Sequence, residues 1–65
     1  MYKLRVYSRK NSINYKRGIK TMIFATGTKK EMIELAVKCF YDLKCQVVRE
    51  SDQKIVFDNG LEPNG

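Results

Sequence analysis

The chain lacks histidine and tryptophan altogether, and its 65 residues include a single proline. Without histidine, proton transfer near neutral pH would fall to carboxylates, lysine or cysteine, whose ordinary pKa values lie further from 7. The seven acidic residues fall at predicted caps, turns, strand ends and ion pairs, where structural roles account for them. No loop of closely spaced carboxylates suits a metal ion. We therefore expect a protein that is not an enzyme and that holds no cofactor and no metal.

Long apolar runs are also missing. No stretch approaches the ~20 residues of a membrane span, and residues 1–9 lack the apolar region of a signal peptide. The two cysteines, Cys39 and Cys45, lie six positions apart across the end of a predicted helix. Helical rise separates them by ~9 Å, whereas a disulfide needs Cα atoms within roughly 7 Å. We predict two small, buried, free thiols and a cytoplasmic location without membrane contact.

Acidic residues are absent from the first thirty positions, which hold nine lysines and arginines. Residues 31–65 hold the other four cations and all seven acids, so the two segments carry +9 (nine minus none) and −3 (four minus seven). A segment of one sign creates a local potential that attracts polyanions or an acidic protein surface. Lysine outnumbers arginine by nine to four, which favours attraction to backbone phosphates over bidentate reading of bases.

The first half of the chain predicts a hairpin. Residues 2–8 alternate between apolar and polar groups, which predicts a strand with one wetted face. Residues 9–18 are polar, carry four cations and end in glycine, so they predict a long loop. Residues 19–26 predict a second strand with apolar side chains on both faces, a pattern typical of a strand that is covered on both sides.

A capping box marks the start of a helix. In Thr28-Lys29-Lys30-Glu31, the threonine hydroxyl and the glutamate carboxylate can each accept a hydrogen bond from a free backbone N–H. The helix is predicted to run to about Lys44, whose cation suits the negative end of the helix dipole. Its core stripe consists of Met32, Leu35, Ala36, Cys39, Phe40 and Leu43. Its solvated side consists of Lys30, Glu34, Lys38 and Asp42, which form a ladder of alternating charge.

The turn before this helix has a second interpretation. Gly27 leads into a helix N-terminus that carries Lys29 and Lys30, an arrangement that can bind phosphate. The spacing of a Walker A motif is absent, and Glu31 would compete for the same backbone amides. Capping is therefore the favoured interpretation, and a phosphate contact is the alternative.

The second half of the chain ends in a predicted hairpin. Residues 46–50 and 54–58 have the pattern of two strands around a short turn. The predicted order is therefore β-β-α-β-β. We expect an α+β fold in which one helix packs on a four-stranded, mainly antiparallel sheet. Residues 1–60 form this single small domain, and residues 61–65 form a loose C-terminal tail.

Aromatic and basic side chains are interleaved between residues 2 and 20. Cations follow phosphates, and aromatic rings offer faces on which bases stack. We predict phosphate contacts from Arg5, Arg9, Lys10, Lys16, Arg17 and Lys20, with stacking on Tyr7 and Tyr15. The favoured function is therefore nucleic-acid binding, to DNA or RNA, through the N-terminal basic hairpin. The alternative is a small protein-binding regulator or inhibitor, of the kind that phages and plasmids encode, which docks on an acidic surface of a larger protein.

Apolar surface exceeds what the predicted fold can cover. Ile33 and Val37 widen the apolar arc of the helix to about 200°, which is more than packing on one sheet requires. Met22 and Phe24 give the second strand a further apolar face. Because large exposed apolar patches usually mark interfaces, we predict a homodimer with these four residues in its contact.

Overall fold

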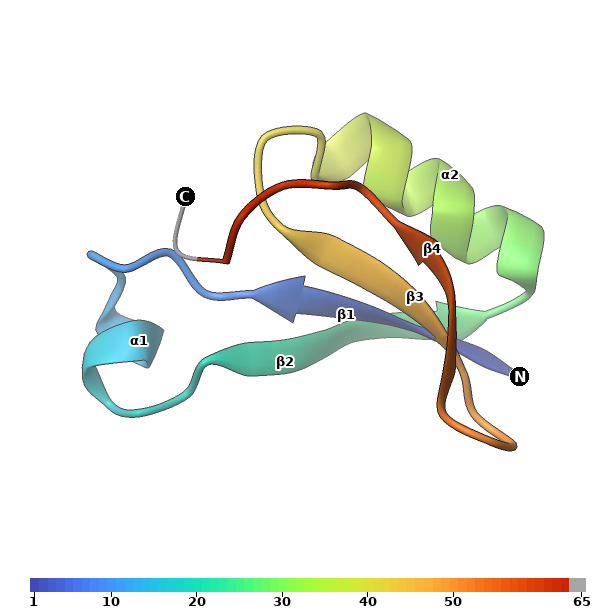
Figure 1. Ribbon diagram of the computed structural model, residues 1–65, viewed down its shortest axis with the longest axis horizontal. Coiled ribbons are helices and arrows are strands. Elements are labelled where there is room, and N and C mark those ends of the chain that lie inside the picture. The colour runs from blue at the N-terminus through green and yellow to red at the C-terminus, as the bar shows by residue number, and fades with distance from the viewer. Residues whose placement is uncertain (64–65) are drawn as a thin grey trace.

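A four-stranded antiparallel sheet and one helix packed on it make up the fold of residues 1–63, which the computed structural model describes (Figure 1). The strands are β1 (Tyr2–Tyr7), β2 (Thr21–Gly27), β3 (Cys45–Arg49) and β4 (Lys54–Asp58), in the spatial order β2-β1-β3-β4. Helix α2 (Lys29–Cys39) lies along one face of the sheet, and helix α1 (Ile13–Lys16) is a short turn of helix between β1 and β2. The predicted α+β class and the packing of one main helix on the sheet are confirmed.

The core lies between α2 and the sheet. Strand alternation turns Leu4 and Val6 of β1 and Val47 of β3 toward the helix. Met32 and Ala36 meet them from α2, and all five residues are at most 5% exposed. Full burial of an aliphatic side chain contributes ~1.5–3 kcal/mol, so this cluster is the main source of stability.

Helix α2 begins as predicted and ends earlier. The Glu31 N–H donates to Thr28 Oγ1 at 3.2 Å, and the Thr28 N–H donates to Glu31 Oε1 at 3.2 Å, which completes the capping box. Hydrogen bonds from the Thr28 hydroxyl and N–H lower the pKa of Glu31 below its ordinary value. The regular helix ends before Phe40 rather than near Lys44, and Leu43 reaches the core from the turn that follows. The predicted end is wrong because the apolar spacing continues past the point where the backbone leaves the helix.

The early end of α2 changes the surroundings of several residues. Cys39 is exposed, so its predicted burial is wrong, whereas Cys45 is buried and both thiols are free as predicted. Asp42 lies beyond the helix and accepts a hydrogen bond from Arg9 at 3.0 Å. No ion pair joins the residues of the predicted charge ladder to one another within the described chain.

Strand β2 is an edge of the sheet, and the prediction that both of its faces are covered is wrong because its side chains are largely exposed. It begins at Thr21 rather than at residue 19, and the three residues after Thr21 are each about half exposed. A bulge in its pairing with β1 shifts the register within the strand. Phe24 falls at this bulge, and its ring packs edge-on against Phe40 with ring centroids 4.8 Å apart.

The connection between β1 and β2 is more ordered than the predicted loop. Ser12 caps α1, because its hydroxyl accepts a hydrogen bond from the Tyr15 N–H at 3.2 Å. Gly18 follows with φ 85°, a left-handed conformation that glycine adopts without strain. The pair of Arg9 with Asp42 then ties this connection to the segment after α2.

The closing hairpin is confirmed, with β3 paired antiparallel to β4. Arg49 and Asp52 form an ion pair of 2.8 Å beside its turn. The hydrogen bond from Arg49 holds the pKa of Asp52 at about 2. Residues 61–63 follow the last strand, and the final two residues of the predicted tail lie outside the described residues.

Candidate functional site

Helix α2 covers one face of the sheet (Figure 1), and we call the opposite face the open face. Since Leu4 and Val6 point toward the helix, the intervening side chains of β1 point the other way. Pairing with the neighbouring strands brings further side chains to the same side. By this register the open face consists of Lys3, Arg5, Tyr7, Thr21, Ile23, Thr26, Gln46, Val48, Ile55 and Asp58.

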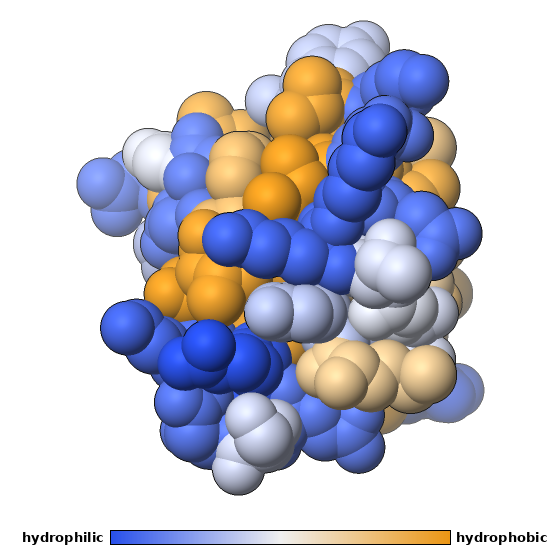
Figure 2. All heavy atoms as spheres, turned by 90° about the vertical axis from the view of Figure 1, so that its right-hand side faces the viewer, coloured by the Kyte–Doolittle hydropathy of each residue, from blue (hydrophilic) through white to orange (hydrophobic). Residues whose placement is uncertain are grey.

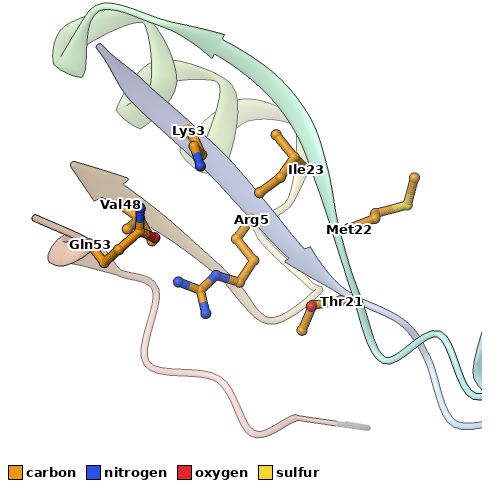
Figure 3. A pocket seen from close by; sticks show the side chains of 7 residues that line it. All are labelled: Lys3, Arg5, Thr21, Met22, Ile23, Val48 and Gln53. Atoms are coloured by element: carbon orange, nitrogen blue, oxygen red, sulfur yellow. The ribbon is translucent and has the colours of Figure 1, made fainter. Parts of the chain in front are cut away.

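A hollow of about 360 Å³ lies on this face. Figure 3 shows Lys3 and Arg5 projecting from the central strand β1, with Val48 and Gln53 of the closing hairpin on one side of them. Two residues of β2, Thr21 and Ile23, lie on the other side, whereas the Met22 side chain points away. The hollow is therefore bordered by two cations on a central strand.

Lys3 and Arg5 combine a partly buried stem with a charged end. Both residues are half-buried, while Val48, which pairs directly with Lys3, is only 1% exposed although no helix covers it. The aliphatic stems of such side chains shield apolar neighbours and leave the charge in water. The ion pairs of residues 1–63 are Arg9 with Asp42, Lys44 with Asp58, and Arg49 with Asp52. Within that range, the two cations of the open face have no acidic partner.

Tyr7 is held on the open face by a chain of hydrogen bonds that crosses three strands. Its hydroxyl donates to Gln46 Oε1 at 3.2 Å, and Gln46 Nε2 donates to Asp58 Oδ2 at 2.9 Å. Lys44 Nζ donates to the same carboxylate at 2.6 and 2.8 Å. The bonds from Gln46 and Lys44 hold the pKa of Asp58 at about 2, so this carboxylate is ionised but neutralised by Lys44. The phenol is thus positioned without adding net negative charge beside Arg5.

The other predicted phosphate-binding residues lie in the connection between β1 and β2. The Ser8 N–H donates to the Lys20 carbonyl at 2.9 Å, so this connection starts where the open face ends at Tyr7. Besides Arg9, its exposed cations are Lys10, Lys16, Arg17 and Lys20, and Tyr15 is half-buried in α1. We call these four cations the connection cluster.

Arg9 differs from the cations of this cluster because it already has a partner. The side chains of Arg9 and Asp42 are 44% and 57% exposed. Exposed pairs of this kind contribute ~0–1 kcal/mol. A phosphate could therefore replace Asp42 at small energetic cost.

The structure brings Arg5 and Tyr7 together on one face and leaves the remaining predicted residues in the connection. The predicted set omits Lys3, which lies on the open face two positions before Arg5. The period-two alternation of residues 2–8 is the signal that places Lys3 on this side.

The turn before α2 is occupied by its own cap. Both the hydroxyl and the N–H of Thr28 are hydrogen-bonded to the Glu31 carboxylate at 2.9 and 3.2 Å. This carboxylate lies where a phosphate on the helix N-terminus would bind, and its pKa is lowered there. The geometry supports the capping interpretation.

Among residues 1–63, no three histidine, cysteine, aspartate or glutamate side chains lie close enough to hold a metal ion together. Over the same range, no helix is both long enough and apolar enough to cross a membrane. Comparison of the chain with protein-family models, with curated proteins and with solved structures finds no match. What the open face and the connection cluster offer chemically is cationic and aromatic contact with a polyanion.

Proposed function

We propose that the protein is a non-catalytic nucleic-acid-binding module that uses the open face and the connection cluster. The observation that carries this proposal is the pair of half-buried cations, Lys3 and Arg5, beside an anchored Tyr7 and without an acidic partner in the described chain. Unpaired cations on a central strand keep their full attraction for phosphate. The connection cluster extends the same positive surface beyond Tyr7.

The geometry favours a single strand over a duplex as the ligand. The exposed side of α2 carries Glu34 as well as Lys38, so the helix offers no uniformly basic surface for a major groove. A sheet with cations and a tyrosine instead resembles the surfaces on which unpaired bases stack while phosphates follow a basic track. In this arrangement Lys3, Arg5 and the connection cluster bind phosphates, and Tyr7 and Tyr15 provide stacking surfaces.

Direct titration with single-stranded DNA, RNA and duplex DNA at ~150 mM salt tests the proposal, since non-specific binders reach Kd values of roughly 10⁻⁴–10⁻⁶ M there. The variant Lys10→Glu/Lys16→Glu/Arg17→Glu should lose binding while it stays folded, because these side chains lie outside the core. The double variant Lys38→Glu/Lys54→Glu, at two exposed positions in the acidic half of the chain, is the control and should keep most of the affinity.

Absence of binding to all three nucleic acids at about 100 μM protein would contradict the proposal. The same cations would then be assigned to an acidic protein surface. A pull-down from lysate with and without nuclease separates the two functions, because protein partners that survive nuclease treatment are not bridged by nucleic acid. The proposal includes a cytoplasmic location, which the two free thiols support.

A further inference from the structure

The two edges of the sheet differ in how they are protected. Strand β4 begins with Lys54 and ends with Asp58, which is paired with Lys44. Strand β2 contains no charged residue from Thr21 to Gly27. Charged side chains on edge strands are a common means of preventing pairing with another chain. Strand β2 lacks this protection.

Unpaired backbone groups lie along the outer side of β2. The Tyr7 N–H donates to the Lys44 carbonyl at 2.9 Å, toward β3, whereas the Ser8 N–H donates to the Lys20 carbonyl at 2.9 Å. Hydrogen-bonded and non-hydrogen-bonded pairs alternate in an antiparallel ladder. Thr21, opposite Tyr7, therefore turns its N–H and C=O away from the sheet. The same alternation turns those of Ile23 outward, and the bulge at Phe24 ends this regular stretch.

Apolar side chains surround this edge. Met22, Ile23 and Phe24 are 46%, 48% and 52% exposed. The edge-on contact of Phe24 with Phe40 joins the strand to the end of α2. At the end of the molecule that carries the N-terminus, hydrophilic side chains instead divide the apolar surface into separate patches (Figure 2).

We propose that β2 pairs antiparallel with β2 of a second copy of this chain, with the two-fold axis between the two Met22 residues. In this register, Thr21 of each copy exchanges two hydrogen bonds with Ile23 of the other, which gives four bonds. In this register the outward N–H and C=O groups of each strand bond to the outward C=O and N–H groups of its copy. The two sheets become one eight-stranded sheet, and the two open faces lie on the same side.

The charges of the chain permit this pairing. The nearest cation, Lys20, lies opposite Phe24 of the second copy. The two copies of Lys20 are then about 13 Å apart along the strands, which exceeds the Debye length of ~8 Å at physiological salt. No charged residue of β2 itself enters the contact.

The size of the surface indicates a weak interface. Half-exposed side chains of this kind leave on the order of 400 Å² of apolar surface at this edge of each copy. Pairing two copies buries at most about 800 Å² of this apolar surface, which is in the range of weak interfaces. We therefore expect a dissociation constant in the micromolar range. Of the four residues predicted for self-association, Met22 and Phe24 lie exposed on β2 and Val37 is exposed on α2, whereas Ile33 is half-buried against the core.

Sedimentation equilibrium at about 10–100 μM protein tests the pairing. The wild type should approach twice the monomer mass of 7.6 kDa. Met22→Lys should be monomeric, because it places two ammonium groups side by side at the axis. Ile55→Lys is the matched control on the other edge strand, where Ile55 is 48% exposed, and it should remain dimeric. A monomeric wild type, or a dimer that Met22→Lys leaves intact, overturns the proposal.

Disulfide trapping tests the register. Directly opposed residues of a non-hydrogen-bonded pair have Cα atoms ~4.5 Å apart, within the range that a disulfide spans. With Cys39→Ser as background, Met22→Cys should form a covalent dimer under mild oxidation. Ile55→Cys in the same background should not. Equal trapping at both positions, or none at Met22, contradicts this register.

Discussion

At the scale of single residues, Thr28 has a role in stability that can be separated from binding. Its hydroxyl accepts from the Glu31 N–H at 3.2 Å and starts the only long helix of the described chain. Thr28→Ala should lower the free energy of unfolding by ~1 kcal/mol. Thr28→Ser, which keeps the hydroxyl, should restore most of that loss in urea denaturation. A variant of full stability that loses nucleic-acid affinity would instead assign the turn at Gly27 to phosphate binding.

Asp58 links the open face to stability at acid pH. Hydrogen bonds from Gln46 and Lys44 hold its pKa at about 2, below the ordinary value of ~3.9 expected in the unfolded chain. The native state therefore binds the proton less readily than the unfolded state, and the stabilisation is complete above the unfolded pKa. It should be lost as the pH falls from about 4 to about 2.

The measurement for Asp58 is denaturant unfolding across this pH range. Asp58→Asn removes the titrating group, so stability should fall less steeply between about pH 4 and pH 2 than in the wild type. Asp52 also has a pKa of about 2, through Arg49, and its own share should persist in that variant. An unchanged slope in Asp58→Asn would show that the network around Gln46 does not hold the carboxylate as described.

The two cysteines should differ in reactivity. Cys39 is exposed, whereas Cys45 is buried, and burial raises the pKa of the Cys45 thiol. An aromatic disulfide reagent should modify one thiol rapidly and the second only as the chain unfolds. Cys39→Ser should remove the rapid phase. Rapid modification of both thiols would contradict this assignment. So would a protein mass two units low, which would indicate an internal disulfide.

At the scale of elements, local signals predict where helices and strands begin. The capping box at Thr28 acts within one helical turn, and the alternation of residues 2–8 depends only on the side-chain period of a strand. Both features are found in the structure. The closing hairpin also has a short-range cause, because its two strands adjoin in sequence.

Features that depend on distant residues could not be predicted in this way. The end of α2 follows from Phe40 and Leu43, which keep helical spacing but pack on the core from a turn. The edge position of β2 follows from β1 pairing with β3 on its other side, a contact between segments about forty residues apart. The residue pattern of β2 does not indicate whether another strand pairs with its outer side.

The candidate site also combines features that local spacing predicts with features that depend on distant residues. Arg5 and Tyr7 share a face, as their spacing predicts. The partner of Arg9 is Asp42, which is 33 positions away, and this pair is visible only in the folded chain. The anchoring of Tyr7 by Gln46 across 39 positions is likewise a consequence of the pairing of β1 with β3.

At the scale of the whole molecule, the proposed phosphate-binding surface and the proposed pairing of β2 would support each other. If β2 pairs with β2 of a second copy, the four strands around the contact have the order β1-β2-β2-β1. The two Arg5 residues then lie three strand spacings apart, about 14 Å measured across the sheet. The joined open faces form one longer positive surface. A single strand that contacts both copies would gain effective concentration over one that contacts a single copy.

The salt dependence of binding to single-stranded nucleic acid tests the central claim, that the open face and the connection cluster neutralise phosphates. Four to six contacts predict a log–log slope of about −3 to −4 for a single strand. In Lys3→Gln/Arg5→Gln the loss of two phosphate contacts should reduce the magnitude of that slope by roughly 1.4. The control Lys38→Gln/Lys54→Gln removes the same charge elsewhere and should keep the wild-type slope. An equal reduction in both double variants, or none in the first, would contradict the assignment of these contacts to the open face.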